Sequence, residues 1–410
     1  MALLRITLTE AATAGERYSL APSIAAALAQ SRLVEMRPEG DGWWRVVPTG
    51  LVGAVRVGDV QVEVWPKEKV RLSHLLFMLG YANNPGFLST DVEAGQYDDL
   101  WPALAESLAR QAERALLHGV LQGYQTLEES SMVVRGRIRV GDQLRRHSGL
   151  PFPLEITYDE YLTDIAENRI VRTALRRMLS VPRLSPAVKA RLSHLDNRLS
   201  GVQILRSGVP RPPWRETRLN SRYHAALRLS EVILANTAAQ TGTGNISVAS
   251  FVVSMWKVFE DFVTTALGES FSRLGEHSET QFPAFLDAPR LDGGARVSMS
   301  VDLVHFVGRH PATVLDAKYK AVDAQGGSLN ADHYQMLAYC TALEVKRAVL
   351  VYAGKNPPLT RRVAFTDIDV TEHPLDLSQT PAEMLGALDR LAASFAALTA
   401  AATSTATVRL

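Results

Sequence analysis

The chain lacks the features that mark several large classes of protein. Among 410 residues there is one cysteine, Cys340, which excludes internal disulfides and cysteine-clustered zinc sites and fits a reducing cytoplasm. No apolar run reaches about 18 residues, so no membrane span is expected. The formal net charge is only +1, so nucleic-acid binding would need local basic faces. There is no G-x-x-x-x-G-K-[ST] loop, so we do not expect this chain to hydrolyse nucleotide by itself.

Composition and length are those of an ordinary globular protein. Hydrophobic residues make up 46 % and charged residues 21 % of the chain, a normal balance, and the length allows two or three domains. The stretch TGTGN at residues 241–245 places glycine and threonine between two segments with strong helical patterns, so it is the best candidate for a linker. We therefore divide the chain into residues 1–243 and residues 244–410.

Hydrophobic spacing predicts strands and helices in both parts. Alternation on both sides of Gly58-Asp59 predicts a two-residue hairpin, and apolar residues three and four apart predict helices, one of them with Asp164 as N-cap. The fold class we expect is α/β in the α+β sense, with a mixed sheet flanked by helices in the C-terminal part. The expected elements are strands within 1–66, helices 74–82 and 100–124, strands within 130–160, helices from 164 and at 186–200, 220–238 and 249–274, strands near 296–306 and 312–320, a helix at 331–343, a strand at 347–354 and a helix at 381–399.

Three charged residues stand out on two neighbouring predicted strands. Asp302 lies near the end of the first strand, and Asp316 and Lys318 lie two residues apart on the second, so the last two share a face that Asp302 can reach. An isolated Asp-x-Lys is more often a salt bridge or a solvated face. Here the neighbouring residues are apolar, so the strands are expected to be buried. Two carboxylates and an ammonium at one sheet edge suit a metal-dependent nuclease, which holds a divalent cation beside an attacking water.

Polar residues on the flanking helices support this interpretation. Glu260 lies beside the apolar stripe of the preceding helix, where a carboxylate is unfavourable unless it has a partner or a function. Gln335 and Tyr339 lie four residues apart and therefore on one face of the following helix. Together the residues resemble the PD-(D/E)xK nuclease superfamily, in the branch related to the RecB nuclease.

That resemblance implies a role for each residue. Asp302 and Asp316 would bind Mg²⁺ through oxygen, with Mn²⁺ as a possible substitute, and the carbonyl of Ala317 could supply another ligand. Glu260 would bind a metal-bound water or a second metal. Lys318 would position or deprotonate the attacking water and stabilise charge on the phosphate. From the helix that follows, Gln335 and Tyr339 would orient the site.

The whole chain resembles the McrC family, the nuclease subunit of McrBC-type modification-dependent restriction systems. The order and spacing of the matching segments carry the resemblance; they are VEVWPKEKV, HLLFMLGYA, VVRGRIRV, YDEYLTDIAENRIVRTAL, MWKVFEDFV, VDLV, VLDAKYK and DHYQMLAY. The resemblance implies that residues 1–243 dock onto a hexameric McrB-like AAA+ GTPase and stimulate it. It implies that residues 244–410 form the endonuclease domain, which cuts double-stranded DNA whose methylation the partner reads.

Basic residues near the middle of the chain are candidates for docking. Arg135, Arg137 and Arg139 alternate along a predicted strand and would share a face, and Arg145 and Arg146 follow in the connection to the next strand. A protruding basic hairpin could enter a ring pore. The equally weighted alternative is an ordinary solvated face, or a contact with DNA phosphates.

Two other functions stay open at this point. A stand-alone RecB-like repair nuclease would use its N-terminal region to bind DNA and would cut without nucleotide. A non-catalytic regulator of an AAA+ NTPase would keep the nuclease fold only as a scaffold, although the presence of Asp302, Asp316 and Lys318 argues against that reading.

Overall fold

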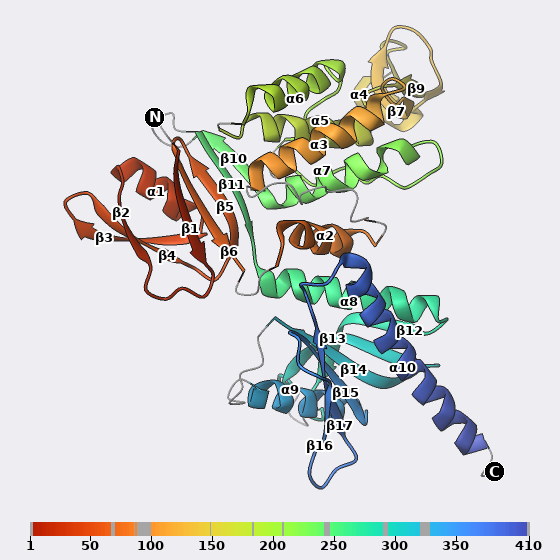
Figure 1. The fold of residues 1–410 in the computed structure, drawn as a ribbon. Helices are drawn as coiled ribbons and strands as arrows, with labels where there is room; N and C mark the ends of the chain where they lie inside the picture. Colours follow the sequence, from red (N-terminus) through yellow and green to blue (C-terminus); the bar gives the residue numbers. More distant parts are fainter. Residues whose placement is uncertain are drawn as a thin grey trace. The chain divides into compact units, whose positions relative to one another are not determined.

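The chain forms two compact units that do not follow each other in sequence (Figure 1). The computed structural model describes residues 3–66, 70–85, 87, 100–147, 149–182, 184–206, 209–241, 247–289, 294–319 and 329–407. The first unit contains residues 1–100 and 240–410, and the second contains residues 101–239. The predicted functional division at 243/244 stays a prediction. Most of the predicted TGTGN linker lies outside the described residues.

The first unit begins with a five-stranded sheet in the order β1-β6-β5-β11-β10. Its members are β1 (Leu4–Thr9), β6 (Val60–Trp65), β5 (Val52–Val57), β11 (Ser247–Val253) and β10 (Thr237–Thr241, which crosses the boundary at residue 240). The expected hairpin joins β5 to β6, with Gly58 at φ +55° as this turn requires. Valines on alternate positions pack against α1 (Pro22–Gln30) and against a small sheet of β2 (Glu16–Ser19), β4 (Trp43–Pro48) and β3 (Val34–Gly40).

A six-stranded mixed sheet forms the rest of the first unit, in the order β12-β13-β14-β15-β17-β16. The strands are β12 (His277–Phe285), β13 (Ser298–Val307), β14 (His310–Lys318), β15 (Arg347–Ala353), β17 (Asp369–Leu375) and β16 (Leu359–Arg362). Strands β14, β15 and β17 run parallel, whereas the other pairs are antiparallel. The predicted fold class is confirmed, although the sequence patterns did not reveal β12, β16 or β17.

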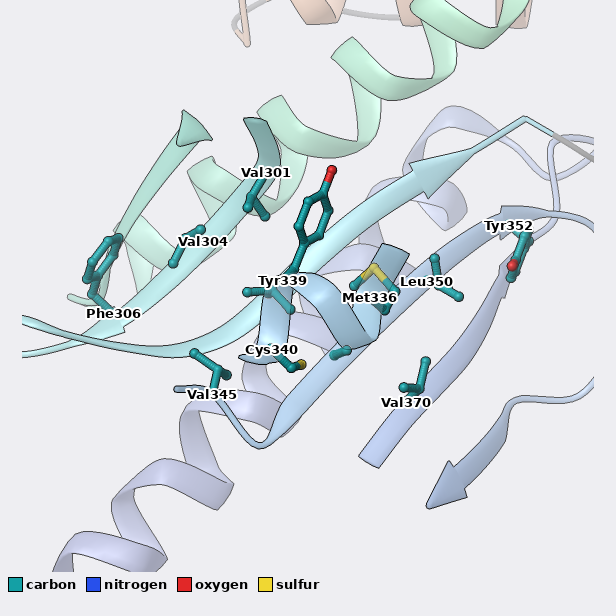
Figure 2. Close-up of a cluster of buried hydrophobic side chains, with 12 residues drawn as sticks. Val301, Val304, Phe306, Met336, Tyr339, Cys340, Val345, Leu350, Tyr352 and Val370 are labelled. Carbon is teal, nitrogen blue, oxygen red and sulfur yellow. The ribbon is translucent and has the colours of Figure 1, made fainter. Parts of the chain in front are cut away.

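Helices cover both faces of this sheet. On one face, α9 (Leu329–Ala342) inserts Met336 and Cys340 among Val304, Val314 and Leu350 of the strands (Figure 2). The opposite face meets α8 (Met255–Arg273), where the Phe271 ring stacks on His305 with centroids 4.3 Å apart. Two further helices, α2 (Leu72–Asn83) and α10 (Pro381–Thr407), pack on α8.

The second unit is mainly helical and carries a small sheet. Its helices are α3 (Leu100–Leu116, which begins at the boundary), α5 (Ala166–Leu179), α6 (Pro186–Arg198), the short η3 (Ser221–Tyr223) and α7 (His224–Asn236). Arg191 of α6 ties that helix to α3 through Glu113, at 2.8 Å. The sheet has the order β7-β9-β8, formed by β7 (Gly123–Ser131), β9 (Leu154–Leu162) and β8 (Arg137–Ile138), with α4 (Val140–His147) between β8 and β9.

Three local predictions were wrong for identifiable reasons. The helix predicted over 100–124 ends at Leu116, because Gly119 adopts a φ of +92° that cannot continue it. The start of the helix predicted over 249–274 is strand β11, whose β-branched and aromatic residues favour pairing with β5. Asp164 does not cap α5; its carboxylate instead binds Arg169 at 2.8 Å and accepts the N–H of Gln203. In the described part of the chain, no helix is long and apolar enough to cross a membrane.

Candidate active site

The predicted acids meet where β13 and β14 separate. The antiparallel ladder between these strands ends with Leu303 opposite Leu315. One step further, the same register places Asp302 beside Asp316. At this point the N–H of Ala317 donates to Oδ2 of Asp302 at 3.2 Å. The carboxylate of Asp302 thus accepts the N–H of Ala317 in place of a backbone carbonyl of β13. Backbone pairing between β13 and β14 stops at the two carboxylates.

Asp316 is buried and has a basic partner. Its side chain is inaccessible to solvent, and its Oδ2 lies 2.6 Å from Nζ of Lys318, which is one-fifth exposed. No hydrogen-bond donor of the described residues satisfies Oδ1. Burial, together with the neighbouring Asp302, raises the pKa of Asp316 to about 7 even though Lys318 opposes the shift. Burial acts to lower the pKa of Lys318, but the carboxylates of Asp316 and Asp302 raise it above the ordinary value.

Helix α9 brings Gln335 and Tyr339 to the same edge. Nε2 of Gln335 donates to the Tyr339 hydroxyl at 2.6 Å, and that hydroxyl donates to the backbone carbonyl of Ser300 at 2.9 Å. Burial raises the pKa of Tyr339, so the phenol stays protonated and able to donate. Figure 2 shows its ring among the cluster residues, with the hydroxyl directed out of the cluster. The two residues therefore attach α9 to β13 two positions before Asp302.

Glu260 of α8 contacts residues other than the two aspartates. Its Oε1 lies 3.1 Å from Nζ of Lys257 and accepts from Nε2 of Gln281 at 3.2 Å. Within the described ranges, no three His, Cys, Asp or Glu side chains are grouped closely enough to hold a metal ion. Glu260 thus does not join Asp302 and Asp316 in a three-carboxylate cage, and its role at a metal stays a prediction.

The oxygen ligands offered by Asp302 and Asp316 suit magnesium, which needs few protein ligands. Mg²⁺ usually keeps several waters and is bound by one or two carboxylates at oxygen. Asp302 and Asp316 provide that pair, and the buried Oδ1 of Asp316 has no donor to satisfy it among the described residues. The backbone of Ala317 is adjacent, since its N–H already reaches Asp302. These residues can accept the cation that the sequence predicts.

Comparisons with known proteins identify the family. The profile described as "McrBC 5-methylcytosine restriction system component" matches residues 46–353. The chain belongs to the McrBC family. A search of the curated proteins finds no match.

Two solved structures resemble the McrBC-family chain. One belongs to a half-complex from a tetradecameric assembly of Thermococcus gammatolerans McrB AAA+ hexamers with bound McrC, with a TM-score of 0.57 and 16 % identity over 94 % of this chain and 98 % of that chain. The other belongs to the McrBC complex of the same organism, with a TM-score of 0.39 and 18 % identity over 65 % of this chain and 88 % of that chain. The first likeness supports the fold, whereas the second is too low to carry an argument.

The predicted docking arginines of the McrBC-family chain do not share one strand. Only Arg137 and Ile138 form β8, because Gly136 turns the backbone at φ +62° and α4 begins at Val140. Asp142 in the first turn of α4 and three basic residues in its last turn complement the helix dipole, which explains a helix where a connection was expected.

Exposure separates these arginines into two groups. Arg135, Arg137 and Arg145 are exposed to solvent. Arg139 instead lies within an ion-pair cluster, 2.9 Å from Glu128 and 3.0 Å from Glu155. Arg146 is exposed but also reaches Glu155, at 3.3 Å. A docking role for any of them stays a prediction, and Arg139 also has a structural role.

Several residues at the site of the McrBC-family chain were missed by the sequence analysis. Ser300 lies two residues before Asp302 and so could have been placed on the same face. Asp332 of α9 is buried and accepts from the Tyr352 hydroxyl at 3.2 Å; its position one turn before Gln335 was the available signal. Gln281 had no signal, because β12 itself was not predicted.

Proposed function

We propose that the McrBC-family chain is the endonuclease subunit of a modification-dependent DNA restriction system, which hydrolyses phosphodiesters with Mg²⁺ and stimulates an AAA+ GTPase partner. The observation that carries the proposal is the convergence of Asp302, Asp316 and Lys318 at the parted ends of two buried strands. A structural ion pair needs only one acid per base. Here Lys318 pairs with Asp316, and the second carboxylate, that of Asp302, adds a negative charge that a bound cation would neutralise.

Each residue has a chemical task in the proposed reaction. Bound Mg²⁺ would supply a Lewis acid for the phosphate and lower the pKa of a water molecule. Asp302 and Asp316 would hold the cation, with the Ala317 carbonyl next to them. Lys318 already lies at the carboxylates, so its ammonium can donate to a phosphate oxygen and stabilise the charge that builds there. Tyr339 would keep β13 and α9 in register around the site.

The partner half of the proposal rests on the family and on the second unit. In the similar solved assembly, McrC is bound to McrB AAA+ hexamers. The second unit of this chain presents Arg135, Arg137 and Arg145 to solvent, and exposed guanidinium groups can pair with carboxylates or phosphates of a partner. The chain would then contribute cleavage, and the AAA+ partner would contribute nucleotide hydrolysis and recognition of methylated cytosine.

The test is cleavage of methylated plasmid DNA by the full chain with its AAA+ partner, GTP and Mg²⁺. We expect Lys318→Ala to lower the cleavage rate by about 100-fold or more through loss of a transition-state donor, and Asp302→Asn to lower it to a similar extent through loss of a charged metal ligand. Lys346→Ala is the matched control, because Lys346 pairs with Asp367 on the surface. Full activity of Lys318→Ala would refute the nuclease assignment. Rapid cutting by the chain alone would instead identify a stand-alone nuclease.

A further inference from the structure

An unusual backbone conformation occurs in β12, directly opposite the candidate site. Gln281 has a φ of +50°, in the left-handed region that side chains other than glycine and asparagine rarely adopt. The pairs on either side of it, Thr280 with Leu303 and Phe282 with Val301, keep the regular antiparallel register. That register puts Gln281 across from Asp302. The departure is thus confined to the residue that faces the candidate metal ligand.

The side chain of Gln281 links α8 to β13. Its Nε2 donates to Oε1 of Glu260 at 3.2 Å, and its Oε1 accepts from Oγ of Ser300 at 3.0 Å. The carbonyl of Ser300 in turn accepts the Tyr339 hydroxyl. One residue therefore connects the acid of α8 to the strand that carries Asp302.

Packing does not account for this arrangement. Gln281 is exposed, so no buried contact would be lost if the backbone relaxed. A strained conformation persists only where its surroundings hold it, and such residues concentrate at functional sites. The two hydrogen bonds are the visible constraint. The bond from Gln281 also restricts the Glu260 carboxylate. That carboxylate also contacts Lys257, which is shared between Glu260 and Asp261.

We propose that Gln281 is a positioning residue, which fixes the orientation of the Glu260 carboxylate against β13 so that it can reach the divalent cation held by Asp302 and Asp316 through a water molecule. This inference rests on the proposed function. Gln281 itself does not touch the reacting atoms. Its loss would leave Lys257 as the remaining contact of the Glu260 carboxylate among the described residues. The carboxylate could then rotate, which would weaken cation binding, while the Asp302, Asp316 and Lys318 cluster would remain.

Two variants that tolerate the left-handed backbone at residue 281 distinguish an effect on cation binding from an effect on protein stability. In Gln281→Gly the left-handed conformation is no longer unfavourable, and in Gln281→Asn it is tolerated while the shorter side chain cannot bridge Glu260 and Ser300. Mn²⁺ binding to the full chain is measured by electron paramagnetic resonance, Mg²⁺ dependence by cleavage with the AAA+ partner, and Tm in EDTA. We expect an unchanged or higher Tm, with the dissociation constant for Mn²⁺ and the Mg²⁺ concentration for half-maximal cleavage both raised about tenfold.

A matched control lies at the end of α9. Glu344 also has a positive φ, of +55°, and is exposed, so Glu344→Gly should relieve the same strain and leave cation binding unchanged. Wild-type Mn²⁺ affinity in both Gln281 variants would overturn the positioning role, as would a fall in Tm with no change in affinity. If the wild-type chain binds Mn²⁺ through Asp316 and the variants weaken it, yet no condition gives cleavage, the proposed nuclease fails and the role of Gln281 stands.

Discussion

We expect Asp316 to lower the stability of the folded chain when no cation is bound, although Lys318 lies beside it. Because burial and Asp302 raise the pKa of Asp316 to about 7, the ionised form is disfavoured in the folded protein. Asparagine keeps the shape and removes the charge. We expect Asp316→Asn to raise the Tm in EDTA at neutral pH by about 1–2 °C, which is what roughly 1 kcal/mol produces with an unfolding entropy of about 2.1 cal/mol/K per residue, and to abolish cleavage.

Differential scanning calorimetry with EDTA and with Mg²⁺ checks this expectation. Asp261→Asn is a suitable comparison, since Asp261 is an exposed acid of α8 that pairs with Lys257, and its Tm should change little. A lower Tm for Asp316→Asn in EDTA would mean that the ion pair with Lys318 outweighs the repulsion from Asp302.

Glu155 makes the opposite electrostatic contribution in the second unit. Its side chain is buried, accepts from the Ser130 hydroxyl, and lies 3.0 Å from both Arg139 and His147. The hydrogen bonds from Ser130 and His147, then the nearby arginines, hold the pKa of Glu155 below its usual range although burial opposes this. A depressed folded-state pKa stabilises the fold above the ordinary glutamate pKa, and this stabilisation is lost as pH falls through the lower, folded value.

Thermal unfolding at a series of pH values tests whether the ionised Glu155 carboxylate stabilises the fold. Glu155→Gln should lower the Tm at pH 7, and its deficit against the wild type should narrow as pH falls below about 4, where the unfolded glutamate becomes protonated. A deficit that stays constant from pH 7 to pH 3 would show that Glu155 acts through shape and not through its charge.

At the residue scale, the sequence patterns predicted which side chains lie together where those residues belong to neighbouring elements, and their catalytic roles stay predictions. Asp302, Asp316 and Lys318 lie on two consecutive strands, so alternation alone places them together. Gln335 and Tyr339 follow from one helical face. Gln281 could not be found in this way, because its importance comes from pairing with β13 and from a contact with α8, neither of which leaves a local pattern.

Secondary-structure elements show where a single glycine decides the path of the chain. An added Cβ at Gly136 would lie 2.3 Å from the carbonyl oxygen of Thr157, and φ there is +62°. Gly136→Ala should therefore lower the free energy of unfolding by about 1–3 kcal/mol and reduce stimulation of the AAA+ partner, because Arg135 and Arg137 flank the turn.

Gly141→Ala provides the control in the same region. Gly141 lies in α4 with no atom near its added Cβ, so alanine should stabilise that helix by up to about 1 kcal/mol. Chemical unfolding and GTPase assays compare the two variants. Equal stability of both would show that the β8–β9 turn adapts to a side chain.

The elements that the sequence predicted include those with strong apolar periodicity, such as α3 and α5. Strand β12 was missed because most of HSETQFPAF is exposed and lacks a buried alternation. Helix α4 was missed because it has no buried residue and depends on charges at its two ends. Both are surface elements whose position is set by the partner strand, β13 or β9, and not by local hydrophobicity.

Over the whole molecule, the two proposed activities belong to different compact units and should separate by mutation. Replacing the exposed Arg135, Arg137 and Arg145 with glutamate should lower GTPase stimulation of the partner at least tenfold and leave Mn²⁺ binding by the chain unchanged. Lys318→Ala should have the reverse pattern, with stimulation retained and cleavage lost. Arg218→Glu is the control, since Arg218 is another exposed arginine of the second unit. If the triple replacement leaves stimulation intact, these arginines do not form the docking surface.

The burial of Cys340 on the sheet-facing side of α9 makes the chain convenient for labelling. It is the single thiol of the protein, and burial raises its pKa to about 12, so it stays protonated and inaccessible to maleimides at neutral pH. Cysteines introduced at exposed Leu117 in the second unit and Phe365 in the first would then carry a donor and an acceptor dye without removal of the native residue. Energy transfer between them would follow the separation of the two units as the AAA+ partner turns over GTP.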